Sequence, residues 1–171
     1  MCIRDRCLSK SETLFMTKTF THLNDHGAAE MVDVSQKQDT ERVAIAEAIV
    51  YLPDDVILAI SDDTVEKGDL FSVARIAGIQ AAKKCSDLIP LCHAIPISKI
   101  SVNFEKNKNI LRVLASCKSN FKTGVEMEAL TAASISALTI YDMCKGINKR
   151  IEIQKVRLIE KTGGKSGSWK V

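Results

Sequence analysis

Asp142 and Lys145 are a pair of residues whose types and spacing suit proton transfer. They stand three positions apart in the run "YDMCK", so on a helix their side chains would lie on one face. An exposed ion pair is common at this spacing. The neighbours here are Tyr141, Met143 and Cys144, however, and such an apolar setting predicts burial. Burial would shift the pKa of both groups, which makes them candidates for acid–base chemistry.

Two glutamates stand near the start of the same predicted helix. Thr123 followed by Glu126 is the pattern of a capping box, which gives Glu126 a structural explanation. Glu128 has no such explanation, because it lies about 200° around the helix from Glu126. Glu128 and Asp142 are fourteen residues apart, or roughly 21 Å along the helix axis. A small substrate cannot touch both within one chain, so either they serve different purposes or two copies share a site.

For Lys67 and His93, a structural and a functional explanation both stay open. Lys67 precedes Gly68 and Asp69 at a predicted helix start, where a positive charge opposes the helix dipole. His93 lies in the apolar run "PLCHAIP", where a histidine is more often a hydrogen-bonded core residue than a ligand. No metal site is indicated, because the adjacent Cys92 and His93 seldom point at one ion and no further ligand has a suitable spacing.

The C-terminal run "GGKSG" (163–167) is similar to the end of a phosphate-binding loop. A Walker A motif also needs a glycine where Ile159 stands and a helix after the motif, and too few residues follow. We therefore reject a P-loop. Two interpretations remain: a frayed terminus, or a glycine-rich segment that closes over an anion with the help of Lys161, Lys165 and Lys170.

Two segments have weak signals for secondary structure. The alanines of residues 42–52 favour a helix, whereas Val43, Ile45 and Ile49 alternate as in a strand. We interpret this segment as a strand. Residues 29–35 could form a short edge strand.

The remaining elements have clearer signals. Asp69 is suited to cap one helix, and Gly146 stands where a second helix would end. Two alternating segments around a polar turn predict a β-hairpin. In chain order, the elements are a strand at 42–52, a helix at 67–85, a hairpin of 99–104 and 110–118, a helix at 123–147 and a strand at 156–161. This βαββαβ order predicts an α+β, ferredoxin-like fold with an antiparallel sheet and helices packed on one face.

The composition is that of a globular domain, with 46% hydrophobic residues and a net charge of +3 among 171 residues. One Trp and two Tyr are few for a protein that stacks nucleic-acid bases. The six cysteines form no C-x-x-C pair, which indicates reduced thiols. Neither a signal peptide nor a membrane-length apolar run is present, so we expect a cytoplasmic protein. We treat residues 1–16 as a disordered or artefactual extension and 17–171 as a single domain.

Several long, irregular runs make the sequence similar to the cyclic pyranopterin monophosphate synthase family of molybdenum cofactor biosynthesis. The resemblance covers about residues 20–169 and rests on runs such as "SDLIPLCH", "TGVEMEALTA", "YDMCK" and "VRLIEKTGG". It implies a ferredoxin-like fold and hexamers built from dimers, with active sites at a subunit interface. It also implies conversion of 3′,8-cyclo-7,8-dihydroguanosine 5′-triphosphate to cyclic pyranopterin monophosphate and diphosphate. No cofactor is expected, and whether Mg²⁺ accompanies the triphosphate stays open.

The resemblance assigns roles to individual residues. Asp142, Lys145 and Lys67 match catalytic residues. The residues that match substrate contacts, together with one lysine added from the glycine-rich tail, are Leu91, Cys92, His93, Glu126, Met127, Glu128, Lys161 and Lys165. Ala94 stands where the family commonly has proline, and Phe121 stands where it often has glycine. Both departures concern affinity more than activity.

Two alternatives belong to other functional classes. A non-catalytic ferredoxin-like module for an anionic metabolite or RNA would bind nucleotide without releasing diphosphate. An assembly protein built on the long Ala-rich helix would tolerate replacement of Glu128, Asp142 and Lys145. Polar residues within an apolar helix favour catalysis. The expected partners are then a small nucleotide-derived substrate and further copies of the chain, without nucleic acid or membrane.

Overall fold

The computed structural model describes residues 26–164 and 167–171. The chain divides into two units, with the boundary between Glu30 and Met31. Residues 26–30 are the described part of the first unit, and the second contains the helices and strands. The interpretation of residues 1–16 as an extension, and the predicted role of Lys165, lie outside the described residues.

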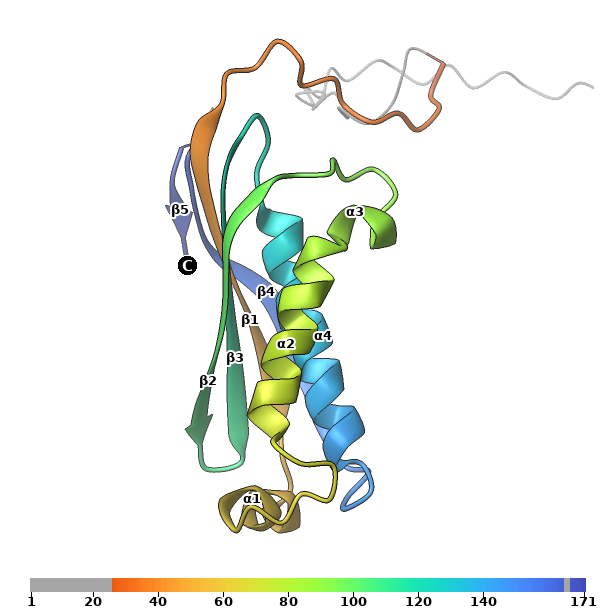
Figure 1. Ribbon diagram of the computed structural model, residues 1–171, viewed down its shortest axis with the longest axis vertical. Coiled ribbons are helices and arrows are strands. Elements are labelled where there is room, and N and C mark those ends of the chain that lie inside the picture. The colour runs from red at the N-terminus through yellow and green to blue at the C-terminus, as the bar shows by residue number, and fades with distance from the viewer. Residues whose placement is uncertain (1–25, 165–166) are drawn as a thin grey trace, which may run out of the picture. The chain divides into compact units, whose positions relative to one another are not determined.

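Within its described residues, the second unit contains a five-stranded sheet and four helices. All strand pairs are antiparallel, in the order β2-β3-β1-β4-β5. The elements in chain order are β1 (Thr40–Tyr51), α1 (Asp54–Ser61), α2 (Leu70–Lys83), α3 (Cys85–Leu88), β2 (Ile97–Asn107), β3 (Ile110–Phe121), α4 (Glu126–Cys144), β4 (Glu152–Thr162) and β5 (Trp169–Lys170). Helices α2 and α4 cover one face of the sheet (Figure 1). The predicted α+β ferredoxin-like fold is confirmed, with α1, α3 and β5 as additions to it.

The ambiguous segment at 42–52 is the central strand β1. It pairs with β3 on one side and with β4 on the other, so its backbone hydrogen bonds are satisfied across the sheet. Ala44, Ala46, Ala48 and Val50 alternate along it and are fully buried. Small side chains on this face allow α4 to pack closely against the strand. The two-residue alternation therefore outweighs the helix propensity of alanine.

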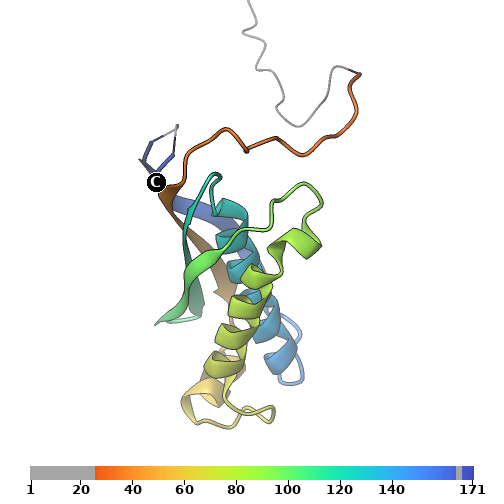
Figure 2. The same cartoon turned by 45° about the horizontal axis from the view of Figure 1, so that its top comes forward.

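Close packing of α2 against α4 sets which ends of the two helices meet. Gly78 of α2 lies so near Ser136 of α4 that an added Cβ would collide with its hydroxyl. The same hydroxyl donates a hydrogen bond to the Ala74 carbonyl at 3.0 Å. Asp69 caps α2 as predicted and accepts a hydrogen bond from the Ser72 N–H at 3.0 Å. The start of α2 thus lies beside the carboxyl end of α4 (Figures 1 and 2).

The hairpin of β2 and β3 is confirmed, but residues 29–35 form no strand of the sheet. Residues 31–35 are instead held by side chains: Lys122 donates to the Ser35 carbonyl at 2.7 Å, and His93 contacts the Val32 carbonyl. Ala29 forms only an isolated β-bridge, and none of residues 31–35 belongs to a described strand, so the predicted edge strand is absent from the described sheet.

The glycine tail forms part of a turn between antiparallel strands. Gly163 and Gly164 adopt φ angles of +91° and +76°, which L side chains rarely tolerate. The chain then returns as β5, with Trp169 opposite Lys161 of β4. A strand rather than a helix follows the glycines, which agrees with the rejection of a P-loop. In the described residues, the frayed-terminus interpretation is wrong.

Candidate active site

Lys67, Asp142 and Lys145 form a cluster at the carboxyl end of α4, here called the carboxyl-end cluster. Lys67 Nζ lies 2.9 Å from Asp142 Oδ2, and Lys145 Nζ lies 2.7 Å from Asp142 Oδ1. Lys67 also donates to the main-chain carbonyl of Asp142 at 2.8 Å. Carbonyl groups in the last turn of a helix lack intrahelical partners and attract cations. Lys67, whose charge opposes the dipole of α2, therefore complements the dipole of α4.

The carboxyl-end cluster is exposed, which corrects the expectation that Asp142 and Lys145 are buried. Their side chains are 55% and 50% accessible, whereas the sequence neighbours Met143 and Cys144 are buried. Successive residues of a helix point about 100° apart, so apolar neighbours do not bury the pair. Hydrogen bonds from Lys145 and then Lys67 lower the pKa of Asp142 to about 2. The bond to Asp142 raises the pKa of Lys145, so both groups are charged at neutral pH.

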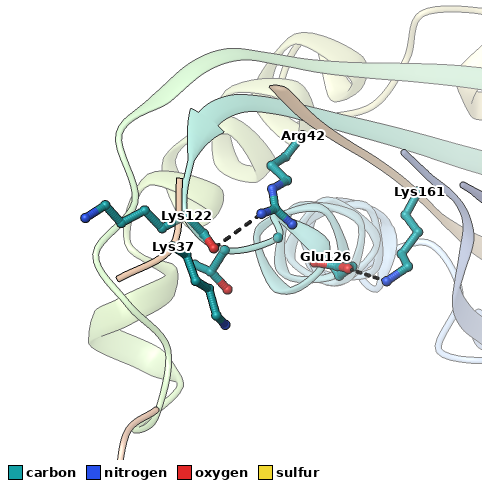
Figure 3. Close-up of a pocket in the computed structure, with 7 residues that line it drawn as sticks. Lys37, Arg42, Lys122, Glu126 and Lys161 are labelled. Carbon is teal, nitrogen blue, oxygen red and sulfur yellow. Dashed lines mark hydrogen bonds and ion pairs between the residues drawn. The ribbon is translucent and has the colours of Figure 1, made fainter. Parts of the chain in front are cut away.

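A pocket of about 390 Å³, here called the amino-end pocket, lies at the opposite end of α4. Figure 3 shows the labelled side chains that surround the start of the helix. The lining residues are Lys37, Arg42, Lys122, Thr123, Gly124, Glu126 and Lys161. Four cationic side chains and one carboxylate give this lining a formal charge of +3. Such a pocket suits a polyanion.

Glu126 belongs to the amino-end pocket and does not cap α4. The N-cap residue is Val125, without a side-chain hydrogen bond, so Thr123 lies two residues too early for the predicted capping box. Glu126 Oε1 instead lies 3.2 Å from Lys161 Nζ (Figure 3), in a pair whose side chains are 31% and 26% exposed. Gly146 follows the helix as expected but lacks the positive φ angle of a typical C-cap glycine.

A second cavity, of about 500 Å³, adjoins the amino-end pocket and shares Lys122 with it. Its lining residues are Met31, Val32, Asp33, Val34, Ser35, His93, Phe121 and Lys122. His93 is half-buried, and its Nε2 donates to the Val32 carbonyl at 2.8 Å. His93 is thus hydrogen-bonded, as the structural explanation expects, and its predicted contact with substrate stays a prediction.

Glu128 is buried on another side of the first turn of α4. It is 3% exposed, and within the described residues its Oε2 has no hydrogen-bond partner. Burial raises the pKa of Glu128. Cys92 is close enough for the Glu128 charge to raise its pKa, after the larger effect of burial. Leu91 is half-buried and Met127 is 37% exposed, and neither lines the two cavities.

The predicted site residues therefore separate into two groups along α4. The three predicted catalytic residues are in direct contact at its carboxyl end. Around its amino end lie Cys92, His93, Glu126, Glu128 and Lys161. Glu126 and Asp142 are sixteen residues apart on one continuous helix, or about 24 Å along its axis. One small substrate cannot reach both ends within a single chain.

Sequence reasoning did not identify Lys37, Arg42 and Lys122 as site residues. For Arg42 a signal existed, because alternation along β1 places it on the same face as the buried Ala44 and Ala46. A charged residue that continues a row of core-facing side chains at the end of a strand indicates a polar site. For Lys37 and Lys122 the sequence holds no comparable signal, since the fold alone brings them to the pocket.

Among the described residues, no group of three or more His, Cys, Asp or Glu side chains could hold a metal ion. The four cysteines in this part of the chain are free thiols. None of the described helices combines the length and the apolar character needed to cross a membrane.

A comparison with protein-family models finds a match to the MoaC family over residues 31–164. The match covers more than three quarters of the chain and includes both ends of α4. It confirms the resemblance that the sequence runs indicate. The chain belongs to the MoaC family and has a role in molybdenum cofactor biosynthesis.

Proposed function

We propose that the protein is a cyclic pyranopterin monophosphate synthase, a phosphorus–oxygen lyase. It would convert (8S)-3′,8-cyclo-7,8-dihydroguanosine 5′-triphosphate to cyclic pyranopterin monophosphate and diphosphate. Family membership supports the pathway. The observation that carries the proposal is the position of Asp142 between two lysines, at 2.9 Å and 2.7 Å.

The carboxyl-end cluster has the groups that such a reaction needs. Rearrangement of the purine-derived ring moves protons between nitrogen and oxygen, and Asp142 is ionised and able to accept one. Lys67 and Lys145 hold this carboxylate in place and remain able to donate protons or to neutralise phosphate oxygens. In the closing step, a hydroxyl oxygen attacks the α-phosphorus and its proton passes to a base. The bond from the α-phosphorus to the bridging oxygen then breaks, and diphosphate leaves.

The amino-end pocket would supply the remaining contacts from another copy of the chain. The two ends of α4 are too far apart to act on one molecule within one chain. We therefore propose a homohexamer, arranged as a trimer of dimers, in which each site joins the carboxyl-end cluster of one copy to the amino-end pocket of its neighbour. In this arrangement Glu126, Glu128, Lys161, Cys92 and His93 contact substrate.

The direct test supplies the cyclised GTP intermediate to the purified protein and measures diphosphate and the pterin product. We expect both products in equal amounts, without an added cofactor and with Mg²⁺ varied as a separate condition. Saturable binding without either product would favour the non-catalytic module for an anionic metabolite. An unchanged rate in an Asp142→Asn variant would remove Asp142 from the chemistry.

A further inference from the structure

We propose that Val65 and Asn148 are positioning residues for the reaction: they hold the Lys67 ammonium group against the Asp142 carboxylate. The effect on the reaction rate rests on the function proposed above, whereas the geometry does not depend on it. Lys67 lies on the loop of residues 62–69, between α1 and α2, and its Nζ contacts Asp142 Oδ2 at 2.9 Å. Since a lysine side chain has several freely rotating bonds, this contact persists only if the backbone that carries Lys67 is fixed.

The loop is fixed first where it leaves α1. The Thr64 N–H donates to the Ala59 carbonyl at 2.9 Å, and Asp63 between them has a φ angle of +54°. This is the pattern of a Schellman helix ending, in which a left-handed residue follows the C-cap and the next N–H bonds back to the last turn. Aspartate is one of the few residues besides glycine that tolerates this conformation. The chain therefore leaves α1 in one defined direction.

Lys67 itself is the third residue of a tight turn that Val65 attaches to the rest of the protein. The Gly68 N–H donates to the Val65 carbonyl at 3.0 Å, which closes the turn of residues 65–68. Gly68 has a φ angle of +89°, a conformation that favours glycine. Val65 is 8% exposed, whereas every other residue of the loop 62–69 is exposed. Burial of this one side chain therefore anchors the turn from which Lys67 extends.

A second attachment joins α1 to the segment that follows α4. Asn148 Nδ2 donates to both carboxylate oxygens of Asp55, at 2.9 Å and 3.1 Å. The Asn148 main chain bonds to the Cys144 carbonyl, and its Oδ1 accepts a hydrogen bond from the Arg150 N–H at 2.8 Å. Asp55 lies in the first turn of α1. This contact therefore fixes α1, and with it the start of the loop, against the end of α4 that carries Asp142.

The two lysines of the carboxyl-end cluster depend on these attachments to different degrees. The charged groups that face the Asp142 carboxylate are Lys145 and Lys67. Lys145 is three residues away on α4, so the helix itself brings it to Asp142. Lys67 is 75 residues away in sequence and reaches Asp142 only through the loop. Val65 and Asn148 should therefore affect the contact of Lys67 and leave that of Lys145 intact.

The test measures kcat/KM for diphosphate release from the cyclised intermediate in Val65→Ala and Asn148→Ala, each with and without Lys67→Met. A small displacement of a catalytic group is costly, so we expect kcat/KM to fall about tenfold in V65A and about threefold in N148A. In the Lys67→Met background neither change should cause a further loss, because the group that they position is absent. Asn148→Ala removes hydrogen bonds without opening the core, so it remains informative if V65A folds poorly.

Two control variants separate positioning from general stability. Val102→Ala removes the same atoms as V65A from a residue of β2 that is 1% exposed, and Asn107→Ala changes an exposed asparagine at the end of β2. Both should keep the wild-type kcat/KM, although V102A should unfold at a lower urea concentration.

The pH profile gives a second measurement. Lys67 contributes to lowering the pKa of Asp142, so a weaker contact raises that pKa. The acid limb of kcat/KM should therefore shift to higher pH in V65A, by less than in Lys67→Met, where the ammonium group is lost altogether. A loss of stability alone, as in V102A, should leave the limb in place. Val65→Ile, which keeps a branched apolar anchor, should restore the wild-type profile.

The positioning role and the proposed function fail in different ways. Unchanged kcat/KM in both V65A and N148A would overturn the positioning role, as would equal losses with and without Lys67→Met. A wild-type protein that releases no diphosphate from the cyclised intermediate would overturn the function. Crystal structures of the two variants would then decide on the positioning role. Lys67 Nζ beyond hydrogen-bond distance of Asp142 Oδ2 would support it, and an unchanged contact in both would rule it out.

Discussion

The two ends of α4 carry charged groups that are organised in opposite ways. At the carboxyl end, Asp142 lies between Lys67 and Lys145, and both exposed lysines bind its carboxylate. At the amino end, four cations surround one carboxylate, and two of them, Arg42 and Lys122, are held by main-chain carbonyls. The first arrangement has a net charge of only +1, with both lysines paired to the carboxylate, and suits proton transfer. The second keeps an excess of positive charge and suits the binding of an anion.

Two acidic residues of α4, Asp142 and Glu128, also differ in their exposure and in the direction of their pKa shifts. Asp142 is exposed, and its lysine partners lower its pKa to about 2. Glu128 is buried without a partner for its Oε2 within the described residues, and burial raises its pKa. One helix thus presents an ionised carboxylate at one end and a carboxyl group that favours its protonated form at the other. Pairs of titratable groups with diverging pKa values are typical of sites that use both an acid and a base.

The largest expected effect is that of Asp142→Asn. Asparagine keeps the shape but cannot accept a proton or carry the charge that orders Lys67 and Lys145, so diphosphate release should fall about 10³-fold. Release of diphosphate from the cyclised intermediate measures this directly. Asp62→Asn, at an exposed position after α1, is a matched control and should retain full activity. Equal activity in both variants would show that the carboxyl-end cluster is not the chemical centre.

Mixed oligomers test whether the two ends act together across a subunit interface. Asp142→Asn and Lys161→Met damage opposite ends, and each alone should be inactive. When equal amounts assemble together, a shared site receives both intact ends in about one case in four. We therefore expect about a quarter of the wild-type activity to return, measured on co-expressed and doubly tagged protein.

The control for this experiment mixes Asp142→Asn with Asp142→Ala, which damage the same end. No shared site in that mixture has an intact carboxyl-end cluster, so activity should stay absent. Suppose that the mixture of Asp142→Asn and Lys161→Met also stays inactive although the protein is shown to be oligomeric. That result would mean that no active site joins the carboxyl-end cluster of one copy to the amino-end pocket of another.

The sequence was sufficient to predict the layout of the fold. The strand alternation of β1, the cap of α2 by Asp69 and the β2–β3 hairpin all depend on local patterns, and the structure confirms them. The long helix with separated acids was also predictable, because its length fixes the distance between its ends. Local sequence patterns are therefore sufficient to predict these features.

The surroundings of the site residues were less predictable. The capping box assigned to Glu126 is wrong because the helix starts two residues later than the pattern suggests, and Lys161 of β4 then becomes its partner. Burial of Asp142 is wrong because neighbours in sequence face different sides of a helix. Lys37 and Lys122 reach the amino-end pocket from segments that only tertiary structure brings together. Local patterns cannot report such contacts.

A smaller effect is expected from the lysines that flank Asp142. Lys145 has the largest part in lowering the pKa of Asp142, and Lys67 comes next. Removing either should raise that pKa, and activity that needs the ionised carboxylate should then be lost at a higher pH as the solution is acidified. The acid limb of the kcat/KM profile should therefore shift to higher pH in Lys67→Met, and to still higher pH in Lys145→Met. A limb that stays in place in both variants would assign the acid limb to a group other than Asp142.

The smallest effect concerns stability at the amino end. Burial makes the folded chain hold the Glu128 proton more tightly than the unfolded chain does. Stability should therefore fall as the pH rises from the unfolded pKa of glutamate, about 4.3, through the raised folded pKa, and the full penalty is present above it. Glu128→Gln cannot ionise and avoids this loss. We expect the free energy of unfolding of the variant to match that of the wild type near pH 4 and to exceed it by about 1–2 kcal/mol at pH 8.

Urea unfolding across this range measures the difference, and the exposed Glu152→Gln should follow the wild type throughout. A difference that does not change with pH would mean that Glu128 is paired in the assembled protein, in which case the contrast between the two acids of α4 would not hold there.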